Sequence, residues 1–120
     1  MLKLAREHGA PLKLVIWNNK AKDLVRDLDL ETRKELGSLL MVLQSGGILG
    51  EPQSKPMTTI HKNAYELRIK DKKGQYRIIY VLALKDKIVI PHAFKKKTQK
   101  TPKKEIDLSK SRLKELLDEN

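Results

Sequence analysis

The sequence of 120 residues contains no cysteine. This absence excludes disulfide bonds, thiolate nucleophiles and zinc sites built on cysteine thiolates. The three histidines, His8, His61 and His92, do not share the short spacing that is typical of metal ligands. We therefore expect no metal and no other cofactor, and a chemistry that relies on oxygen and nitrogen side chains alone.

Long apolar runs are missing as well. A membrane-spanning helix needs about 18 or more consecutive apolar residues, and the sequence contains no such stretch. The N-terminus, MLKLAREHGAPLK, also lacks the apolar segment of a signal peptide. We expect a cytoplasmic protein without a membrane partner.

Acidic residues are few relative to basic ones. The chain has 15 Asp and Glu against 26 Lys and Arg, which gives a net charge of +11. The electric field around such a protein attracts polyanions, so nucleic acid is the leading class of partner. A chain of this length suits one domain over residues 1–120 with a single core, in which residues 1–11 form a basic N-terminal extension.

The first half of the chain predicts one strand and two helices. The short apolar segment LKLVIWN is β-prone and is closed by the polar NNK. In NKAKDLVRDLD and in LETRKELGSLLMVLQSGG the apolar residues recur at helical spacing. Asp29 is the expected N-cap of the second helix, and Gly46 and Gly47 are its expected stop. Residues 48–63 are rich in Gly, Pro, Ser and Thr, which predicts a loop.

The second half predicts three antiparallel strands and a helix. The strands are AYELRIK, QYRIIYVLAL and IVIPHAF, joined by turns at residues 72–74 and 85–86. Thr101 is the expected N-cap of the final helix, with Pro102 at its first position. We expect this helix to be buried through Ile106, Leu113 and Leu117. The order β-α-α-β-β-β-α indicates an α/β (α+β) fold with a mainly antiparallel sheet packed against helices.

The hairpin of the first two of these strands brings two arginines together. A four-residue loop at residues 71–74 places Arg68 directly opposite Arg77 on one face of the sheet. Opposed like charges destabilise a sheet by about 0.2–1 kcal/mol, so we expect a carboxylate or a bound anion between the guanidiniums, and Glu66 is the nearby carboxylate. In the alternative, both arginines only solvate an exposed face, with Glu66 as their counter-ion.

A lysine-rich segment follows the third strand. Residues 92–106 read HAFKKKTQKTPKKEI and contain six lysines before the first acidic residue, Glu105. Such a run is often no more than a solvated connector. The final helix, however, turns its positive N-terminal end toward the same region, which favours phosphate binding there.

Neighbouring residues of these strands also allow two interpretations. His92 is expected on the strand face of Ile88 and Ile90, where a hydrogen-bonded structural histidine is more common than a catalytic one. Aromatic side chains could stack on RNA bases, although alternation along a strand is more typical of core residues. The aromatic residues concerned are Tyr76, Tyr80 and Phe94.

Five features together resemble the phage-derived branch of the HigB/RelE-like toxins. They are Trp17 near the end of the first strand, Arg33 in the second helix, and the segments YELRIK, QYRIIYV and HAFKKKTQKTPKKEID. The resemblance runs from about Leu12 to Leu117 and is most specific in the last third. It implies a compact RelE-like toxin that enters the ribosomal A site and cleaves mRNA. It also implies a cognate antitoxin that neutralises the toxin, with a helix-turn-helix protein of the HigA type as the expected partner.

The resemblance also implies roles for single residues. Arg77 matches the arginine that such toxins keep next to the scissile phosphate. Residues 95–97 match the basic end of the last strand, where other branches place an acid, a base or a second cation. Arg68 and Glu66 follow the pattern of the branch without a defined role. Pro91 departs from regular strand geometry because it cannot donate a hydrogen bond to the sheet.

The implied chemistry suits this inventory of residues. RNA carries its own nucleophile, the 2′-hydroxyl, so a metal or a covalent intermediate is not required. Arg77, helped by Arg68, would stabilise a phosphorane-like transition state by about 3–4 kcal/mol per interaction. The general base stays open between a lysine, His92 and Glu66. We favour Lys95 or Lys97, since alternation places both on the strand face that carries neither Ile90 nor Phe94.

The predicted site therefore has a catalytic and a phosphate-binding set. The catalytic set is Arg77, Arg68, Lys95, Lys97 and His92. The phosphate-binding set is Glu66, Lys96, Lys100, Lys62 and Lys70. Two alternatives use the same residues: a non-catalytic RNA- or DNA-binding module, and a toxin-like phage protein that has lost cleavage.

Overall fold

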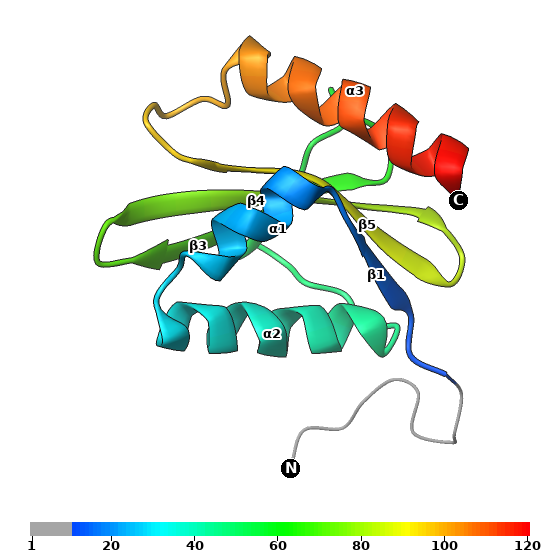
Figure 1. The fold of residues 1–120 in the computed structure, drawn as a ribbon, viewed down its shortest axis with the longest axis horizontal. Helices are drawn as coiled ribbons and strands as arrows, with labels where there is room; N and C mark the ends of the chain where they lie inside the picture. The colour runs from blue at the N-terminus through cyan, green and yellow to red at the C-terminus, as the bar shows by residue number, and fades with distance from the viewer. Residues whose placement is uncertain (1–10) are drawn as a thin grey trace.

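A computed structural model describes residues 11–120 of the protein. The predicted N-terminal extension, apart from Pro11, lies outside the described residues. The elements follow one another as β1 (Leu14–Trp17), α1 (Asn19–Arg26), α2 (Leu30–Gln44), β2 (Ser54–Pro56), β3 (Ala64–Asp71), β4 (Gly74–Leu84), β5 (Lys87–Lys95) and α3 (Lys103–Glu119). The strands form one sheet in the order β1-β5-β4-β3-β2, with α2 on one face and α3 on the other (Figure 1). The predicted α/β class with a mainly antiparallel sheet is confirmed.

Local capping explains where the first two helices begin and end. The side chain of Asn18 accepts hydrogen bonds from the backbone N–H groups of Lys20 and Ala21, which fixes the start of α1. Helix α2 follows Asp29 as predicted, although the Asp29 side chain makes no capping hydrogen bond. Gly46 lies just beyond α2 with φ of 86°, a conformation that favours glycine.

The β3–β4 hairpin has the predicted register. Arg68 is paired with Arg77 across the two strands. The carboxylate of Asp71 accepts hydrogen bonds from the backbone N–H groups of Lys73 and Gly74, so the side chain of Asp71 closes the turn. The register that places the two arginines side by side is therefore set locally, by the turn.

Both edges of the sheet differ from the prediction. The expected loop at residues 48–63 contains β2, which pairs antiparallel with β3. The composition of this segment is misleading because an edge strand tolerates Pro56, whose missing N–H is not needed on the outer side. At the other edge β1 runs parallel to β5, with Leu14 opposite Lys87. Neither pairing has a signal in the local sequence.

The start of α3 also corrects a prediction. Pro102 is the N-cap and the helix begins at Lys103, whereas Thr101 was expected as the cap. Instead the Thr101 hydroxyl donates a hydrogen bond of 2.5 Å to Oε2 of Glu66 on β3. The helix buries Leu113 as predicted, together with Ser109 and Leu116, while Ile106 and Leu117 are half-buried. Within residues 11–120, no helix is both long and apolar enough to cross a membrane.

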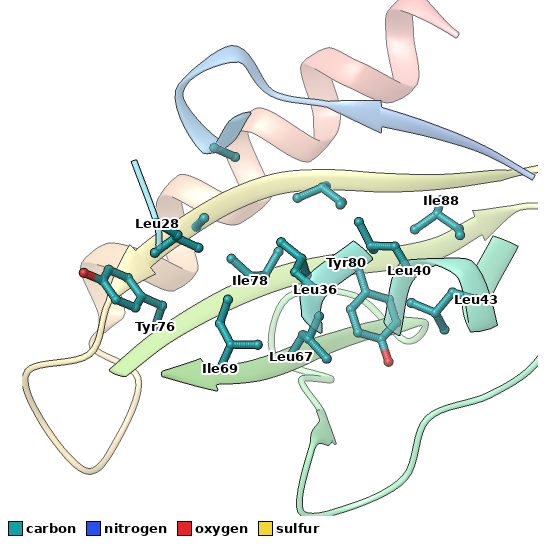
Figure 2. Close-up of a cluster of buried hydrophobic side chains, with 13 residues drawn as sticks. Leu28, Leu36, Leu40, Leu43, Leu67, Ile69, Tyr76, Ile78, Tyr80 and Ile88 are labelled. Atoms are coloured by element: carbon teal, nitrogen blue, oxygen red, sulfur yellow. The ribbon is translucent and has the colours of Figure 1, made fainter. Parts of the chain in front are cut away.

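The face of the sheet under α2 carries the larger apolar cluster. Leucines of α2 meet side chains from the central strands, as Figure 2 shows. Burial of one such side chain contributes about 1.5–3 kcal/mol to folding. The labelled members are Leu28, Leu36, Leu40, Leu43, Leu67, Ile69, Tyr76, Ile78, Tyr80 and Ile88.

Strand β5 contains a bulge near its middle. Between two successive pairings β4 advances from Ile79 to Val81, while β5 runs from His92 back to Val89 and so spans one residue more. Pro91, which is fully buried, lies in this interval. A residue without an N–H is suited to a position that leaves the ladder.

The bulge reverses the alternation of side chains along β5. Ile88 and Ile90 belong to the α2-side cluster, but His92 contacts α3 on the opposite face. The prediction that His92 shares a face with Ile88 and Ile90 is therefore wrong. Lys95 pairs with Tyr76, a member of the α2-side cluster, so Lys95 shares the face of Ile90, contrary to the prediction. The strand also ends at Lys95, before it reaches Lys97.

Candidate functional site

The carboxylate of Glu66 lies between the two arginines on the α3 side of the sheet. Its Oε1 atom is 3.2 Å from Nε of Arg77 and 3.7 Å from Nε of Arg68. Its Oε2 atom accepts the hydrogen bond from Thr101. One buried carboxylate thus joins β3, β4 and the segment before α3, and it offsets the like-charge pair that the register creates.

The two arginines differ in burial. Arg68 is partly exposed, but Arg77 is only 7% exposed, so the expectation of an exposed arginine face is wrong for Arg77. Burial lowers the pKa of Arg77, because the guanidinium loses hydration, and Arg68 lowers it further, while Glu66 raises it. Nη1 of Arg77 donates to the backbone carbonyl of Tyr76 at 3.2 Å. The position of the Arg77 guanidinium is therefore fixed from two sides.

A pocket of about 440 Å³ opens beside Arg77. Arg77, Phe94 and Lys95 contribute from the sheet, residues 96–102 from the connecting loop, and Lys104 and Glu105 from α3. In Figure 1 this loop returns from the end of β5 to the start of α3. The first turn of α3 therefore borders the pocket, as the predicted phosphate site requires.

A second hollow, of about 610 Å³, also borders Arg77. Its lining includes Gln53, Arg68 and Lys70, and it shares Arg77 and Lys96 with the first pocket. The two hollows therefore meet at Arg77 and Lys96. Together they form a path from the start of α3 to the β3–β4 hairpin whose charged lining residues are mainly basic, with Glu105 and Glu35 as its acidic members.

The six lysines of the predicted site separate into four groups, the first of which is Lys70, which lines the second hollow. Lys96, Lys97 and Lys100 border the first pocket. Lys95 also borders it, but its side chain lies against Gly74 at the hairpin turn, where an added Cβ would meet the Lys95 stem at 2.6 Å. Lys62 lies in the turn before β3 and lines neither hollow.

His92 is buried and has a partner on each ring nitrogen. Nη1 of Arg112 is 2.7 Å from Nδ1, and Oε1 of Glu105 is 3.0 Å from Nε2. A guanidinium can only donate, so Nδ1 accepts and Nε2 carries the proton that is donated to Glu105. Burial lowers the pKa of His92, the hydrogen bond with Glu105 raises it and the positive charge of Arg112 lowers it. This geometry favours a structural histidine over a free proton acceptor.

Of the three aromatic residues considered for base stacking, only Phe94 borders the first pocket. Its ring stacks on His92 at a centroid distance of 5.4 Å. Tyr76 and Tyr80 belong to the α2-side cluster, where burial raises the pKa of Tyr80 and the Ser54 hydroxyl forms a hydrogen bond with its hydroxyl. The core interpretation is confirmed for both tyrosines, and also for Phe94, which is buried in the apolar cluster on the α3 side.

Three residues of the site were not anticipated from the sequence. The sequence predicts Thr101 as the cap of α3, and it predicts no site role for Glu105 or Arg112. A signal exists for Glu105, because it is the first acidic residue after the lysine run and lies in the first turn of a helix. Arg112 has no such signal, since its contact with His92 depends on the bulge and on the docking of α3.

The arrangement suits the binding of an anion next to a fixed guanidinium. Within residues 11–120, no three histidine or acidic side chains gather into a possible metal site. Comparison with curated proteins gives no match. Residues 23–114 match the family model described as "Phage derived protein Gp49-like (DUF891)", which covers most of the chain, including α2, the three long strands and most of α3. The protein therefore belongs to the Gp49-like family of phage-derived proteins, a toxin-like family of the RelE type.

Proposed function

We propose that the protein is the toxin of a type II toxin–antitoxin pair, of the HigB kind, and that it cleaves mRNA on the ribosome. The observation that carries this proposal is the buried Arg77 guanidinium, held by Glu66 beside a lysine-lined pocket. A buried arginine with a partner on only part of its donor set is suited to a phosphate that arrives from solvent. Family membership supplies the biological setting.

The site has more donors than its own carboxylate can occupy. A guanidinium carries five N–H donors; Arg77 forms an ion pair through Nε with Glu66 and donates one Nη1–H to the Tyr76 carbonyl. Nη2 has no acceptor among residues 11–120, and Arg77 borders both hollows. A phosphodiester at this point would receive charge-assisted hydrogen bonds from Arg77 and charge from Lys96, Lys97 and Lys100.

The reaction is a transesterification within the RNA. The 2′-oxygen attacks the adjacent phosphorus, and the products are a 2′,3′-cyclic phosphate and a 5′-hydroxyl end. Arg77 stabilises the additional negative charge of the transition state, and Arg68 assists from the second hollow. Preorganised donors of this kind contribute about 3–4 kcal/mol each.

The partner that neutralises the toxin is proposed to cover the same cationic surface. An acidic or amphipathic segment of a helix-turn-helix antitoxin would either fill the pocket beside Arg77 or block entry into the ribosomal A site. Co-expression with the protein encoded next to the toxin gene, followed by co-purification at low salt, tests this part. Failure to bind at low salt would count against it.

The test of the activity uses Arg77→Lys instead of Arg77→Ala. Lysine keeps a cation against Glu66, so the buried pair survives while the bidentate fork is lost. Toxic expression and cleavage of mRNA on translating ribosomes should fall by about a hundredfold or more. Arg26→Lys is the matched control, because Arg26 is an exposed arginine of α1 that pairs with Asp23.

Two results would contradict the proposal. A folded Arg77→Lys protein that cleaves mRNA at the wild-type rate would remove Arg77 from the chemistry. Wild-type protein that binds ribosomes or RNA but never cleaves would support the non-catalytic binding module instead.

A further inference from the structure

Glu105 places a carboxylate in the pocket beside Arg77, where phosphate binding does not require one. Among the described residues that line the pocket beside Arg77, Glu105 is the single carboxylic acid, and its side chain is only 19% exposed. A fixed negative charge there opposes the approach of phosphate. Binding alone therefore gives no reason for Glu105, and its position suggests a step in the chemistry.

A chain of hydrogen bonds fixes the Glu105 side chain. Arg112 donates to Nδ1 of His92, and His92 donates from Nε2 to Oε1 of Glu105. A guanidinium has no acceptor atom, so Arg112 selects the His92 tautomer in which Nδ1 is unprotonated. In that tautomer Nε2 carries the proton that is donated to Glu105. Oε2 of Glu105 has no hydrogen-bond donor within residues 11–120. One carboxylate oxygen is thus anchored, and the other stays free to accept a proton.

Three of the other candidate acceptors are occupied or turned away, and the fourth, Lys97, lies exposed in the loop beyond the end of β5. Both oxygens of Glu66 have partners, in Arg77 and Thr101. Nδ1 of His92 is taken by Arg112. The side chain of Lys95 lies over Gly74 on the far face of the sheet. Glu105 combines a free acceptor oxygen with a fixed position in the pocket that contains Arg77.

We infer that Glu105 is the general base of the proposed ribonuclease, held in place by His92 and Arg112. The inference rests on the proposed function. Oε2 takes the proton of the 2′-hydroxyl while the 2′-oxygen forms its bond to phosphorus. The bond from phosphorus to the 5′-oxygen breaks, and the 5′-oxygen takes a proton from water. Glu105 then returns its proton to solvent, so the reaction consumes no net proton.

The decisive variant is Glu105→Gln. Its amide oxygen still accepts the hydrogen bond from His92, but it cannot take up the 2′ proton. The single-turnover rate at saturating protein should fall by about a hundredfold or more, and affinity for ribosome-bound mRNA should be equal or higher because a negative charge leaves the pocket.

Asp107→Asn is the matched control. Asp107 lies two residues further along α3, pairs with Lys103 at 3.2 Å, and does not line the pocket. The substitution removes the same unit of charge from the same helix, so it reports any effect of net charge. The rate of this variant should stay at the wild-type value.

The outcomes separate this inference from the proposed function. If wild-type protein cleaves, Arg77→Lys does not, and Glu105→Gln cleaves within about threefold of wild type, Glu105 is not the base and the proposed function stands. If Glu105→Gln loses affinity and rate together, Glu105 only docks α3 and the inference is overturned. If wild-type protein does not cleave, both proposals fall.

Discussion

The two faces of the sheet are built differently from the same strands. On the α2 side, residues of β3, β4 and β5 form an apolar cluster whose buried members include Tyr76 and Tyr80 but no Asp, Glu, Lys, Arg or His. On the α3 side, the apolar cluster shares the face with three buried ionisable groups: Glu66, Arg77 and His92. A buried ion pair seldom adds net stability compared with apolar residues of similar volume. Apolar burial on the α2 face therefore offsets the free-energy cost of burying charged groups on the α3 face.

The charges on the α3 face are held by specific partners. Glu66 contacts three side chains, and His92 has a partner on each nitrogen. An exception is Nε of Arg68, which is buried without a hydrogen-bond acceptor in the described part of the chain and is 3.7 Å from Glu66. The two arginines thus keep N–H groups without an acceptor in the described residues, at the place where the phosphate is proposed to bind.

The largest expected effect comes from removal of the carboxylate. Glu66→Ala leaves Arg77 buried without its counter-charge, which should lower the free energy of unfolding by about 3–5 kcal/mol. Urea denaturation followed by circular dichroism measures the change. The double variant Glu66→Ala/Arg77→Leu should recover most of the loss, because no buried charge is then left.

Additive effects of the two substitutions would contradict this view of the α3 face. Asp23→Ala provides the comparison on the surface. Its ion pair with Arg26 is 3.6 Å long and both side chains are well exposed. Its loss should cost no more than about 1 kcal/mol.

A substitution on the α2 face should affect stability and leave the chemistry unchanged. Leu36 is 2% exposed and packs in the α2-side cluster. Leu36→Ala should cost about 3 kcal/mol through lost burial and the cavity that remains. Cleavage per folded molecule, measured at a temperature where the variant is fully folded, should match wild type. A drop in this specific rate would show that the two faces are coupled.

The local rules of the sequence account for one part of the site and miss another. Arg68 and Arg77 could be placed side by side because a short turn determines the register. Thr101 was misassigned because a residue before a proline and a helix satisfies the N-cap rule, while the actual partner, Glu66, is distant in sequence. The predicted strand face of His92 is wrong because the alternation of residues along a strand does not reveal a bulge. Tertiary contacts thus decide what sequence periodicity leaves open.

Stability should fall in mild acid because of His92. Its folded-state pKa is lowered by burial, so the unfolded chain binds the proton more readily. The contribution of His92 is complete above its unfolded pKa of about 6.5 and is lost as pH falls toward the lower folded value. The loss can reach about 1.4 kcal/mol per pH unit. Two side chains of α3 face the His92 ring. Glu105 raises the pKa of His92 and so opposes the effect of burial, whereas Arg112 lowers the pKa further.

The measurement compares thermal unfolding between pH 7.5 and 5.5 for wild type and His92→Gln. The stability difference between the two proteins should shrink as pH falls through this window. His61→Gln is the control, because His61 lies in the turn before β3, where its Nδ1 accepts a hydrogen bond from the backbone N–H of Asn63. A pH-independent difference for His92→Gln would show that the buried histidine does not titrate with folding.

The smallest effect should come from single lysines of the loop. Lys97 borders the pocket and is exposed, whereas Lys114 is exposed on α3 and does not line the pocket. Both Lys→Ala changes remove one positive charge, so a difference between them reports position and not net charge. The binding constant for single-stranded RNA is measured between low and moderate salt. The slope of its logarithm against the logarithm of the salt concentration should become shallower by about 0.7 for Lys97→Ala and should hardly change for Lys114→Ala. Equal slopes for the two variants would show that Lys97 attracts RNA only through its contribution to net charge. Recognition of phosphate would then depend on the buried Arg77 alone.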